Sequence, residues 1–534
     1  MADVNQIRAQ IEQEKAVLGI EFGSTRIKAV LIGEDNSPIA EGGHNWENHF
    51  ENGVWTYPLE EVWDGLQDAY RDLVSDIENK YGVIPTGYGA IGISAMMHGY
   101  IPFNENNELL SPFRTWRNTM TLEAADILTE LFQYNIPQRW TVAHLYQSIL
   151  NGDDYIADIR YLPTLAGYVH WQLTGEKVES VGDASGQFPI DIETADYNQR
   201  MVRQFNELIA DKHYPWTLTD ILPKSLRAGE YAGKLTEEGA RKLDPSGHLH
   251  GGIPMCPPEG DGGTGMVATN AVARRTGNVS AGTSVFGMVV LEKELSRYYR
   301  ELDMVTTPAG DLVAMAHCNN CTSDLNSWMG MFKELMESMG APVDMGALFT
   351  TLFTKAMEGD ADGGHLLSFN YLSGEHVTGM EEGRPLFVRS AESRFNLANF
   401  MRTLIMASLS SVTFGMNLLT QNEGVKIDRM NGHGGIFKTK GVAQTLLSAA
   451  LDCPVTVMKT AGEGGAWGVA LQAAYLIRGN GKSLAEWLDT EVFSADDGET
   501  IMASEADVAG FAKYMETYKK GLPIQRAAVD HFEM

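Results

Sequence analysis

The sequence predicts a duplicated α/β fold, because the same order of elements occurs in each half of the chain. An apolar β-hairpin with a short Gly–hydroxyl turn opens each half, at residues 17–32 and 279–291. Strand–helix units then follow each hairpin. Alternating strands and helices are typical of α/β domains, and a repeated order of elements indicates duplication. The two halves share little sequence, so the prediction depends on the order of elements.

Apolar spacing locates the elements of the first half. Residues 1–15 predict a short helix, because Ile7 and Ile11 are one helical turn apart. The stretch 122–253 is mainly helical and is interpreted as an insertion that covers a substrate site. Between these segments and beside the hairpin, we expect a strand near 38–41, a helix at 59–78 and a buried strand at 90–94.

The second half continues from its hairpin with further strand–helix units. The expected elements are a long apolar helix at 397–419, a strand at 429–431, a helix at 438–451, a strand at 455–457 and a helix at 466–477. The predicted domains are an N-terminal helical extension at 1–16, a first domain at 17–268 and a second domain at 269–534.

Composition excludes several classes of function. The chain has 534 residues, 44% of them hydrophobic, and a formal net charge of −29. Such a surface repels nucleic acid and anionic membranes, whereas a local backbone nest can still bind ATP. No signal peptide or apolar run of membrane-spanning length is apparent. We therefore expect a cytoplasmic protein without nucleic-acid or membrane partners.

The chain has four cysteines, which fits a reducing compartment rather than a disulfide scaffold. Cys318 and Cys321 form a CxxC motif. A zinc site of this type needs a second pair of ligands, and no second CxxC is present. Reduced, partly buried thiols are the simpler interpretation.

The two hairpin turns are candidate phosphate sites. Their sequences are Gly23-Ser24-Thr25 and Gly282-Thr283-Ser284. Glycine permits a tight turn, and the hydroxyl residues add donors to the backbone N–H groups. One such turn also closes ordinary hairpins. Two copies, one in each half, indicate two related domains that bind one polyphosphate.

Asp261 lies in a glycine-rich segment, 260–265, near the predicted domain boundary. A carboxylate there can accept a hydroxyl proton, although from composition alone an exposed Asp-Gly turn is the commoner case. Glycines at 432–435 and 462–465 follow strands and open helices, as nucleotide-binding segments do. Neither segment is a Walker or a dinucleotide motif.

In this order, the motifs resemble those of the FGGY carbohydrate kinases over residues 18–477. The resemblance implies two ribonuclease-H-like domains of the actin and hexokinase superfamily, which flank an interdomain cleft. It also implies ATP-dependent transfer of the γ-phosphate to a sugar hydroxyl, with Asp261 as the catalytic base. The triplet Met97-His98-Gly99 is similar to the sugar pocket of xylulokinase-like members. A ketopentose, L-ribulose or D-xylulose, is the substrate that this similarity favours.

The resemblance also assigns the remaining site residues. The implied sugar-binding residues are Met97, His98, Gly99, Trp116, Arg117, Asp183 and Asp261. The implied ATP-binding residues are Gly23, Ser24, Thr25, Lys28, Gly282, Thr283, Ser284, Gly434, Gly435, Gly464 and Gly465. Glu21 is the implied Mg²⁺ residue, acting through water.

Two departures from the family pattern leave alternatives open. Glu21 stands where the first motif has Asp, and Trp116-Arg117-Asn118 replaces Trp-Asn-Asp. Another sugar, a polyol or a sugar acid therefore remains a candidate substrate. A second class is an ATP-binding sensor of the same superfamily that transfers no phosphate. A homodimer is the default expectation for the oligomeric state.

Overall fold

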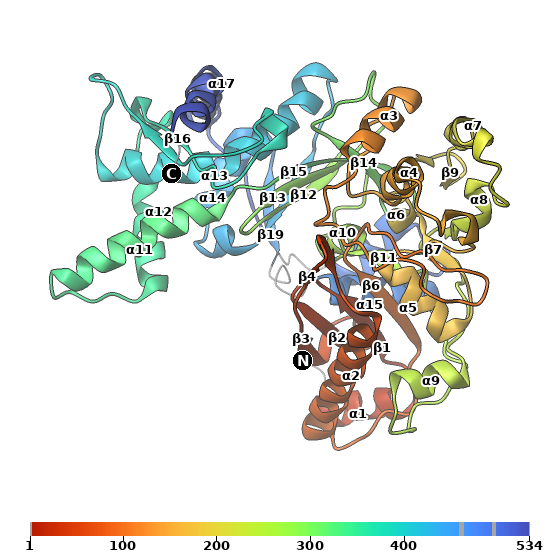
Figure 1. The fold of residues 1–534 in the computed structure, drawn as a ribbon. Helices are drawn as coiled ribbons and strands as arrows, with labels where there is room; N and C mark the ends of the chain where they lie inside the picture. The colour runs from red at the N-terminus through yellow and green to blue at the C-terminus, as the bar shows by residue number, and fades with distance from the viewer. Residues whose placement is uncertain (1–2, 459–463, 494–497, 533–534) are drawn as a thin grey trace. The chain divides into compact units, whose positions relative to one another are not determined.

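The computed structural model describes residues 3–458, 464–493 and 498–532, and the chain divides into two compact units (Figure 1). Unit 1 comprises residues 1–272, 304–313 and 463–496. Unit 2 comprises 273–303, 314–462 and 497–534. The first limit, at residue 272, falls close to the expected boundary at 268. The two later segments of unit 1 make the division discontinuous in sequence.

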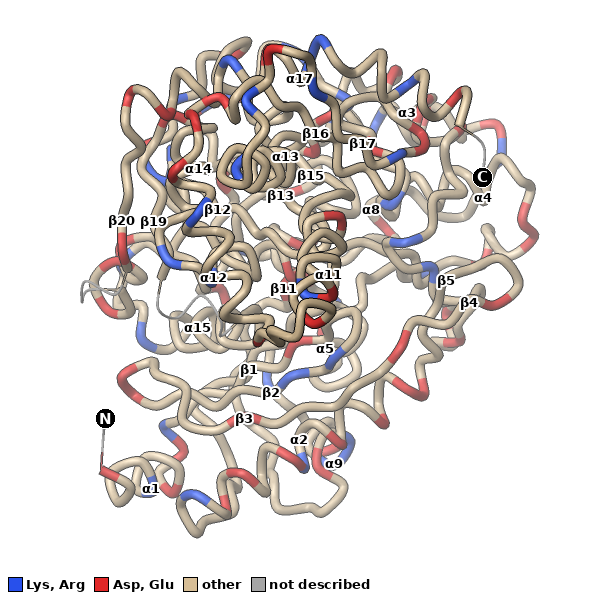
Figure 2. The backbone as a smooth tube through the Cα atoms, turned by 90° about the vertical axis from the view of Figure 1, so that its left-hand side faces the viewer, with Lys and Arg blue, Asp and Glu red and all other residues tan. Residues whose placement is uncertain are grey.

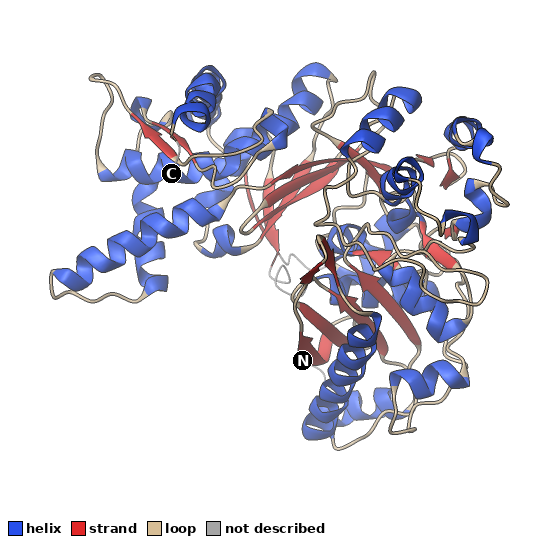
Figure 3. Cartoon of the chain, in the orientation of Figure 1, coloured by secondary structure: helices blue, strands red, loops and turns tan. Residues whose placement is uncertain are grey.

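Unit 1 is built on a five-stranded sheet with the order β11-β6-β1-β2-β3 (Figure 3). Its strands are β1 (Val17–Phe22), β2 (Arg26–Ile32), β3 (Pro38–Asn45), β6 (Ala90–Ala95) and β11 (Glu259–Gly260). The expected hairpin is antiparallel, whereas β6 lies parallel to β1 and β11 lies parallel to β6.

Helices and short strands complete unit 1. The helices are α1 (Val4–Glu12), α2 (Leu59–Tyr81), α3 (Leu122–Phe132), α4 (Thr141–Asn151), α5 (Leu165–Thr174), α6 (Val181–Ala184), α7 (Gln199–Leu208), α8 (Leu218–Ile221), α9 (Glu237–Leu243), α10 (Asp261–Ala268), α15 (Gly464–Arg478) and α16 (Leu484–Trp487). The short strands are β4 (His49–Glu51), β5 (Val54–Thr56), β7 (Val178–Ser180), β8 (Ile190–Asp191), β9 (Asp196–Tyr197), β10 (Lys224–Leu226) and β14 (Asp303–Thr306), the last beginning one residue before the segment 304–313. Single turns occur at η1 (Ile156–Asp158), η2 (Ala210–Lys212) and η7 (Leu488–Val492).

Two helices cover opposite faces of this sheet. Gly42 of β3 faces α2, where an added Cβ would lie 2.2 Å from the backbone nitrogen of Leu73. Gly19 of β1 faces α15, with the carbonyl oxygen of Ala466 2.2 Å from such a Cβ. The strand register places Gly42 level with Ile20, which points to the face opposite Gly19. Unit 1 is therefore a sheet between helices from distant parts of the sequence.

Unit 2 contains the second hairpin, β12 (Thr276–Ala281) and β13 (Val285–Val290). The strand order within it is β15-β13-β12-β18-β19-β20. Its other strands are β15 (Leu312–Cys318, from residue 314 in this unit), β16 (Leu367–Phe369), β17 (Leu386–Val388), β18 (Arg429–His433), β19 (Val455–Met458) and β20 (Gly498–Ile501). Its helices are α11 (Thr322–Ser338), α12 (Met345–Ala356), α13 (Leu397–Asn417), α14 (Val442–Leu451) and α17 (Glu505–His531), with single turns η3 (Gly363–His365), η4 (His376–Thr378), η5 (Leu418–Asn422) and η6 (Gly435–Lys438).

The structure differs from the expected helices in two places. α14 begins at Val442 rather than near 438, because η6 and the left-handed Gly441 (φ +80°) precede it. α15 matches the helix expected at 466–477, but it packs in unit 1 instead of unit 2. Its glycines and alanines fit closely against β1 and β6, and this contact decides its place.

The helix formed by α13 and η5, Leu397–Asn422, is long and apolar enough to cross a membrane, with a mean hydropathy of 1.3. However, 78% of the relevant window is buried inside the protein. Burial of this kind is what a core helix requires. Asp and Glu residues, red in Figure 2, occur along the described parts of the chain, in keeping with the net charge of −29.

Candidate functional site

The candidate residues of unit 1 lie at one edge of its sheet. Phe22, Ala95 and Gly260 are level with one another across β1, β6 and β11. The first Gly–hydroxyl turn and Asp261 directly follow β1 and β11, and the Met97 triplet follows β6 after one intervening residue. The carboxyl ends of parallel strands are a common ligand-binding position in α/β proteins.

Asp261 is the first residue of α10 and is exposed to solvent. Its Oδ1 accepts a hydrogen bond of 3.1 Å from the backbone N–H of Met97. Desolvation by the surrounding protein raises the pKa of the carboxyl, and the backbone N–H groups of Met97 and Gly262 oppose that shift. The positive charge of Arg139 also lowers it. Asp261 is thus a solvent-accessible carboxylate whose position is fixed by backbone hydrogen bonds.

Glu21 and Asp261 are carboxyl groups at the same edge of the unit 1 sheet, and their charges interact. Burial raises the pKa of Glu21 to about 7, and the negative charge of Asp261 contributes to the rise. The backbone N–H of Ala466 donates a hydrogen bond of 3.1 Å to Glu21 Oε2. Glu21 is therefore fixed by the start of α15.

Glycines of α15 make this contact possible. A Cβ at Gly465 would lie 2.2 Å from Glu21 Oε1, and a Cβ at Gly468 would lie 2.1 Å from the carbonyl oxygen of Thr264. Gly464 has a φ of +75°. The structure thus brings Gly465 to Glu21, and space is open around the preceding Gly464; the rest of the segment 462–465 lies outside the described residues.

The first Gly–hydroxyl turn is held from behind through its carbonyl groups. Trp46 Nε1 donates to Gly23 O at 2.7 Å, and the Tyr57 hydroxyl donates to Ser24 O at 2.6 Å. The Trp46 and Tyr57 rings stack, with centroids 4.2 Å apart. Ser24 and Thr25 remain exposed, and neither hydroxyl has a hydrogen-bond partner among the described residues. The turn is arranged to offer donors outward.

Lys28 lies opposite Glu21 in the β1–β2 register. Its Nζ forms an ion pair of 3.0 Å with Glu41, and its charge lowers the pKa of Glu21. Lys28 is therefore in the neighbourhood of the site, although its direct partner is Glu41.

The Met97 triplet has an unusual backbone. His98 has a φ of +70° and Gly99 a φ of +116°. His98 is buried, and its Nδ1 lies 3.2 Å from the carbonyl oxygen of Gly186. Asp183 is also buried, and its Oδ2 accepts a hydrogen bond of 2.6 Å from Thr164 Oγ1. The structure places Met97, His98 and Asp183 around the segment that leads into Asp261.

Trp116 and Arg117 lie elsewhere on unit 1. Trp116 packs against the hydrophobic core of unit 1, and the exposed Arg117 guanidinium lies 3.8 Å from the centre of the Trp55 ring. Cation–π contact accounts for the position of Arg117. The contacts of these two residues do not extend to Asp261.

The turn of unit 2 is held in the same manner as the first. Gly282 O accepts hydrogen bonds from the Thr322 N–H at 3.1 Å and the Thr322 hydroxyl at 2.7 Å. Thr283 O accepts one of 3.0 Å from the Cys321 N–H. Thr283 is exposed and Ser284 is partly buried. The beginning of α11 thus supports the second turn.

Gly434 and Gly435 join this turn at the carboxyl edge of the unit 2 sheet. Ser280 of β12 is level with His433 of β18, and the two strands are parallel. Gly434 has a φ of +107°, and a Cβ there would lie 2.3 Å from the carbonyl oxygen of Ala281. Space is open around Gly435. A side chain at Gly434 would push β18 away from the turn.

The cysteines are free and buried. Burial and the nearby Glu375 raise the pKa of the Cys321 thiol to about 12, which disfavours the reactive thiolate. Among the described residues, no group of three or more His, Cys, Asp or Glu side chains is arranged to hold a metal ion.

Three residues near Asp261 were not predicted from the sequence. They are Arg139, which precedes α4, and the buried acids Glu179 and Glu259. Glu259 was visible in the segment before Asp261, but its burial depends on glycines from other segments. Arg139 lies in a loop with no recognisable spacing to Asp261.

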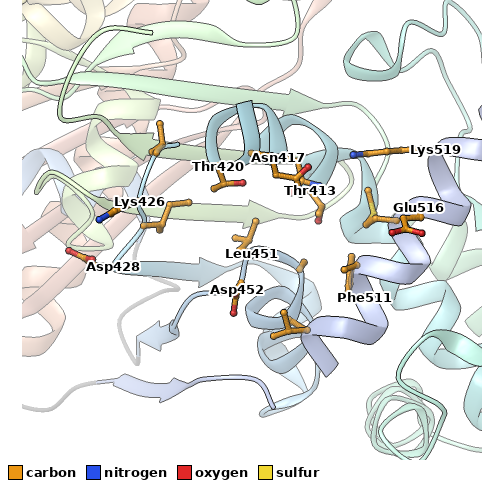
Figure 4. A pocket seen from close by; sticks show the side chains of 18 of the residues that line it. Thr413, Asn417, Thr420, Lys426, Asp428, Leu451, Asp452, Phe511, Glu516 and Lys519 are labelled. Atoms are coloured by element: carbon orange, nitrogen blue, oxygen red, sulfur yellow. The ribbon is translucent and has the colours of Figure 1, made fainter. Parts of the chain in front are cut away.

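A cavity of about 700 Å³ lies in unit 2 among α13, α14 and α17 (Figure 4). Thr413, Asn417, Phe511 and Glu516 are among its lining residues. The cavity also borders Asp428, just before β18, so it is at the opposite edge of the sheet from Gly434. It contains none of the candidate site residues.

Comparison with protein families agrees with this fold. Residues 16–265 match the N-terminal domain, and residues 277–477 the C-terminal domain, of the FGGY family of carbohydrate kinases. The chain belongs to the FGGY family of carbohydrate kinases. It is an ATP-dependent sugar kinase with the two-domain fold of that family.

Three distant relatives each cover nearly the whole chain. A xylulose kinase of Haemophilus influenzae is 22% identical over 522 residues, 94% of this chain and 98% of its own. The structure of ligand-bound xylulose kinase from Lactobacillus acidophilus has a TM-score of 0.78 at 16% identity, covering 97% and 99% of the two chains. Gluconate kinase from Lactobacillus acidophilus has a TM-score of 0.77 at 16% identity, covering 96% and 98%.

Proposed function

We propose that this kinase transfers the γ-phosphate of ATP to the terminal hydroxyl of a ketopentose, L-ribulose or D-xylulose, with Asp261 as general base. The observation that carries the proposal is the position of Asp261. It is an accessible carboxylate at the carboxyl edge of β11, hydrogen-bonded to Met97 of the sugar-pocket triplet. The name of the Haemophilus influenzae relative favours D-xylulose between the two.

Asp261 needs only to accept the proton that leaves the sugar hydroxyl. Phosphoryl transfer has a loose transition state, so the protein contributes chiefly positioning and neutralisation of charge. The hydroxyl becomes strongly acidic as its oxygen bonds to phosphorus. The N–H groups of Met97 and Gly262 hold the carboxylate for that moment.

The nucleotide would use the two Gly–hydroxyl turns and the glycine-rich strand ends. Ser24 and Thr25 in unit 1, and Thr283 and Ser284 in unit 2, offer hydroxyl and backbone donors to phosphate oxygens. Gly434, Gly435, Gly464 and Gly465 leave room for the nucleoside, because they carry no side chain. Lys28 adds positive charge near Glu21.

Mg²⁺ fits the residues of unit 1. This ion is usually bound through one or two carboxylates, several waters and substrate phosphates rather than by an all-protein cage. Glu21 and Asp261 together make the electrostatic potential at this sheet edge more negative, which favours a cation. Glu21 would hold the hydrated ion. When bound, Mg²⁺ neutralises phosphate charge.

A sugar acid is the second candidate substrate. Arg139 places positive charge near Asp261, and Arg117 replaces a neutral residue of the family pattern. A carboxylate substrate would gain from Arg139, the cation near Asp261. The similarity to the gluconate kinase fold is in keeping with this alternative.

We further propose a cytoplasmic enzyme whose partners are the sugar and ATP, with a homodimer as the default assembly, and without nucleic-acid or membrane ligands. The strongly acidic chain supports this proposal.

A coupled assay of ADP release, run over ketopentoses, ketohexoses, polyols and aldonic acids, tests the proposed function. We expect D-xylulose or L-ribulose to give the highest kcat/KM. An aldonic acid with the highest value would favour the second candidate. ADP release that no sugar alters would contradict transfer and favour the ATP-binding sensor.

A further inference from the structure

Three carboxyl groups are buried together beside the turn that carries Asp261. They belong to Glu179 of β7, Asp183 of α6 and Glu259 of β11, and each side chain has an exposed fraction of 0 to 1%. Within the described chain, none of the three forms an ion pair with Lys, Arg or His. A buried carboxylate normally requires such a partner.

The protein makes room for Glu259 by omitting side chains. A Cβ at Gly182 would lie 2.4 Å from Glu259 Oε1, and a Cβ at Gly263 would lie 2.7 Å from its Cδ. These glycines belong to α6 and α10, so two separate segments leave space for the same carboxyl. The space is a feature of the fold and not a packing defect.

Hydrogen bonds connect Glu259 to both functional segments. Its Oε1 accepts a bond of 2.9 Å from the N–H of Gly260, the residue before Asp261. The backbone N–H of Asp183 also donates to it, and the Ser180 hydroxyl is bonded to Oε2. Glu259 thus joins the start of α6 to the start of α10.

Two oxygen atoms of the cluster, Asp183 Oδ1 and Glu179 Oε2, have no hydrogen-bond partner among the residues that the structure describes. A Cβ at Gly260 would lie 2.9 Å from Asp183 Oδ1, so this oxygen is beside the Asp261 turn. Three carboxylates cannot all be ionised in such an enclosed space. At least one must hold a proton, which then acts as a hydrogen-bond donor.

We propose that Glu259 is an uncharged positioning residue, a carboxylic acid that holds Asp183 and the Asp261 turn at a fixed separation. In this form its O–H donates to Ser180 Oγ while Oε1 accepts from Gly260. Asp183 Oδ1 then remains available for a hydroxyl of the substrate. The inference rests on the proposed function of Asp183 and Asp261.

The electrostatic surroundings agree with a protonated Glu259. Burial, followed by the charge of Asp183, raises its pKa to about 8. Burial also raises the pKa of Asp183 to about 7. The surrounding segments carry these other titratable groups: Glu179 of β7, Asp183 of α6, Asp261 of α10, Cys256 before β11 and His170 of α5. Burial lowers the pKa of His170, so that the imidazole stays neutral.

The sign of the pH effect follows from these values. Below about pH 8 Glu259 is neutral, and its hydrogen bonds hold Asp183 and the Asp261 turn in place. Above that pH it ionises beside Asp183 and loses its donor. The kcat of the wild-type protein should therefore fall on the alkaline side, with a midpoint near 8.

Glu259→Gln tests the proposal, because glutamine reproduces the uncharged acid. We expect its kcat at pH 7 to stay within about threefold of wild type, and the alkaline fall to disappear or move by at least about one pH unit. An unchanged alkaline fall, or a tenfold loss at pH 7 in a folded variant, would overturn the proposal. Glu259→Ala should lose tenfold or more in kcat while ATP affinity stays unchanged. Wild-type kcat in a folded Glu259→Ala protein would overturn it too.

Glu179→Gln is the matched control. It makes the same isosteric change in the same cluster, but Glu179 bonds to the N–H of Thr164 and not to the Asp261 turn. The alkaline fall should persist in this variant. Its loss there would assign the proton to Glu179 and contradict the role of Glu259.

Infrared difference spectroscopy of the substrate-free protein separates this inference from the proposed function. A protonated-carboxyl band that titrates near pH 8 should be present in wild type and absent in Glu259→Gln. Absence of the band in wild type would overturn the inference. Failure of every sugar to support turnover would instead overturn the proposed function, whatever the band shows.

Discussion

At the scale of residues, the site depends on how acidic side chains are kept at one sheet edge without mutual repulsion. Asp261 is accessible and receives backbone N–H bonds, whereas Glu21 receives one from Ala466. Glu259, Asp183 and Glu179 are enclosed, and their pKa values are raised. The environment therefore gives neighbouring carboxyls different charge states.

Replacing Glu21 with Gln should stabilise the ligand-free protein at alkaline pH. The pKa of Glu21 is about 7 in the folded state, against 4.5 when unperturbed, so the native state holds more protons between those values. Stability contributed by Glu21 is thus complete below about 4.5 and is lost as pH rises through 7. The gain in Glu21→Gln should be negligible at pH 4.5 and reach about 1–3 kcal/mol at pH 8.

Urea unfolding at several pH values measures this difference. Glu41→Gln is the control, because Glu41 is an exposed carboxyl of the same sheet and should change stability by less than about 0.5 kcal/mol. A Glu21→Gln gain that is the same at every pH would show that Glu21 is not a strained carboxylate.

The sequence offers both exposed and enclosed candidates for the site, among them Asp261, His98 and Asp183, but not Glu179 or Glu259 as buried neighbours. Asp261 and the Gly–hydroxyl turns belong to short local sequence patterns, so their chemical roles can be proposed without knowledge of the fold. The role of Glu259 depends on Gly182 and Gly263, which meet it only after folding. No local pattern carries that information.

At the scale of elements, the close approach of α15 to the unit 1 sheet positions Glu21. Gly19 and Gly92 on the strands meet Ala466 and Val469 of the helix, and Gly468 meets Thr264 of α10. The helical spacing of α15 is visible in the sequence, and its length was predicted well. Its partner was not, because a small-residue helix face fits any flat sheet until the tertiary fold selects one.

Gly468→Ala should destabilise unit 1. The new Cβ would lie 2.1 Å from the backbone oxygen of Thr264, so α10 and α15 must separate. Overpacking of this kind costs about 1–3 kcal/mol, measured by denaturant unfolding. Gly265→Ala in α10 is the matched control, since space around Gly265 is open and the helix should gain about 0.5–1 kcal/mol. Equal stability of Gly468→Ala and wild type would contradict the packing described for α15.

At the scale of the whole molecule, both units use the same device at different places in the chain. Each has a hairpin turn whose carbonyls are held from behind, by Trp46 and Tyr57 in unit 1 and by the start of α11 in unit 2. The duplication was predicted from the order of elements, and both domain matches agree with it. The discontinuous division was not predictable, since the segments 304–313 and 463–496 have ordinary compositions.

The central claim is phosphoryl transfer to a sugar hydroxyl with Asp261 as base. Phosphorus NMR of ATP incubated with D-xylulose or L-ribulose tests it most directly, on wild type and Asp261→Asn. Wild type should form a sugar phosphomonoester at the terminal carbon in step with ADP. The Asp261→Asn protein should bind ATP with similar affinity and form the ester at least about a hundredfold more slowly. Near-normal ester formation by Asp261→Asn, or inorganic phosphate as the wild-type product, would contradict the account.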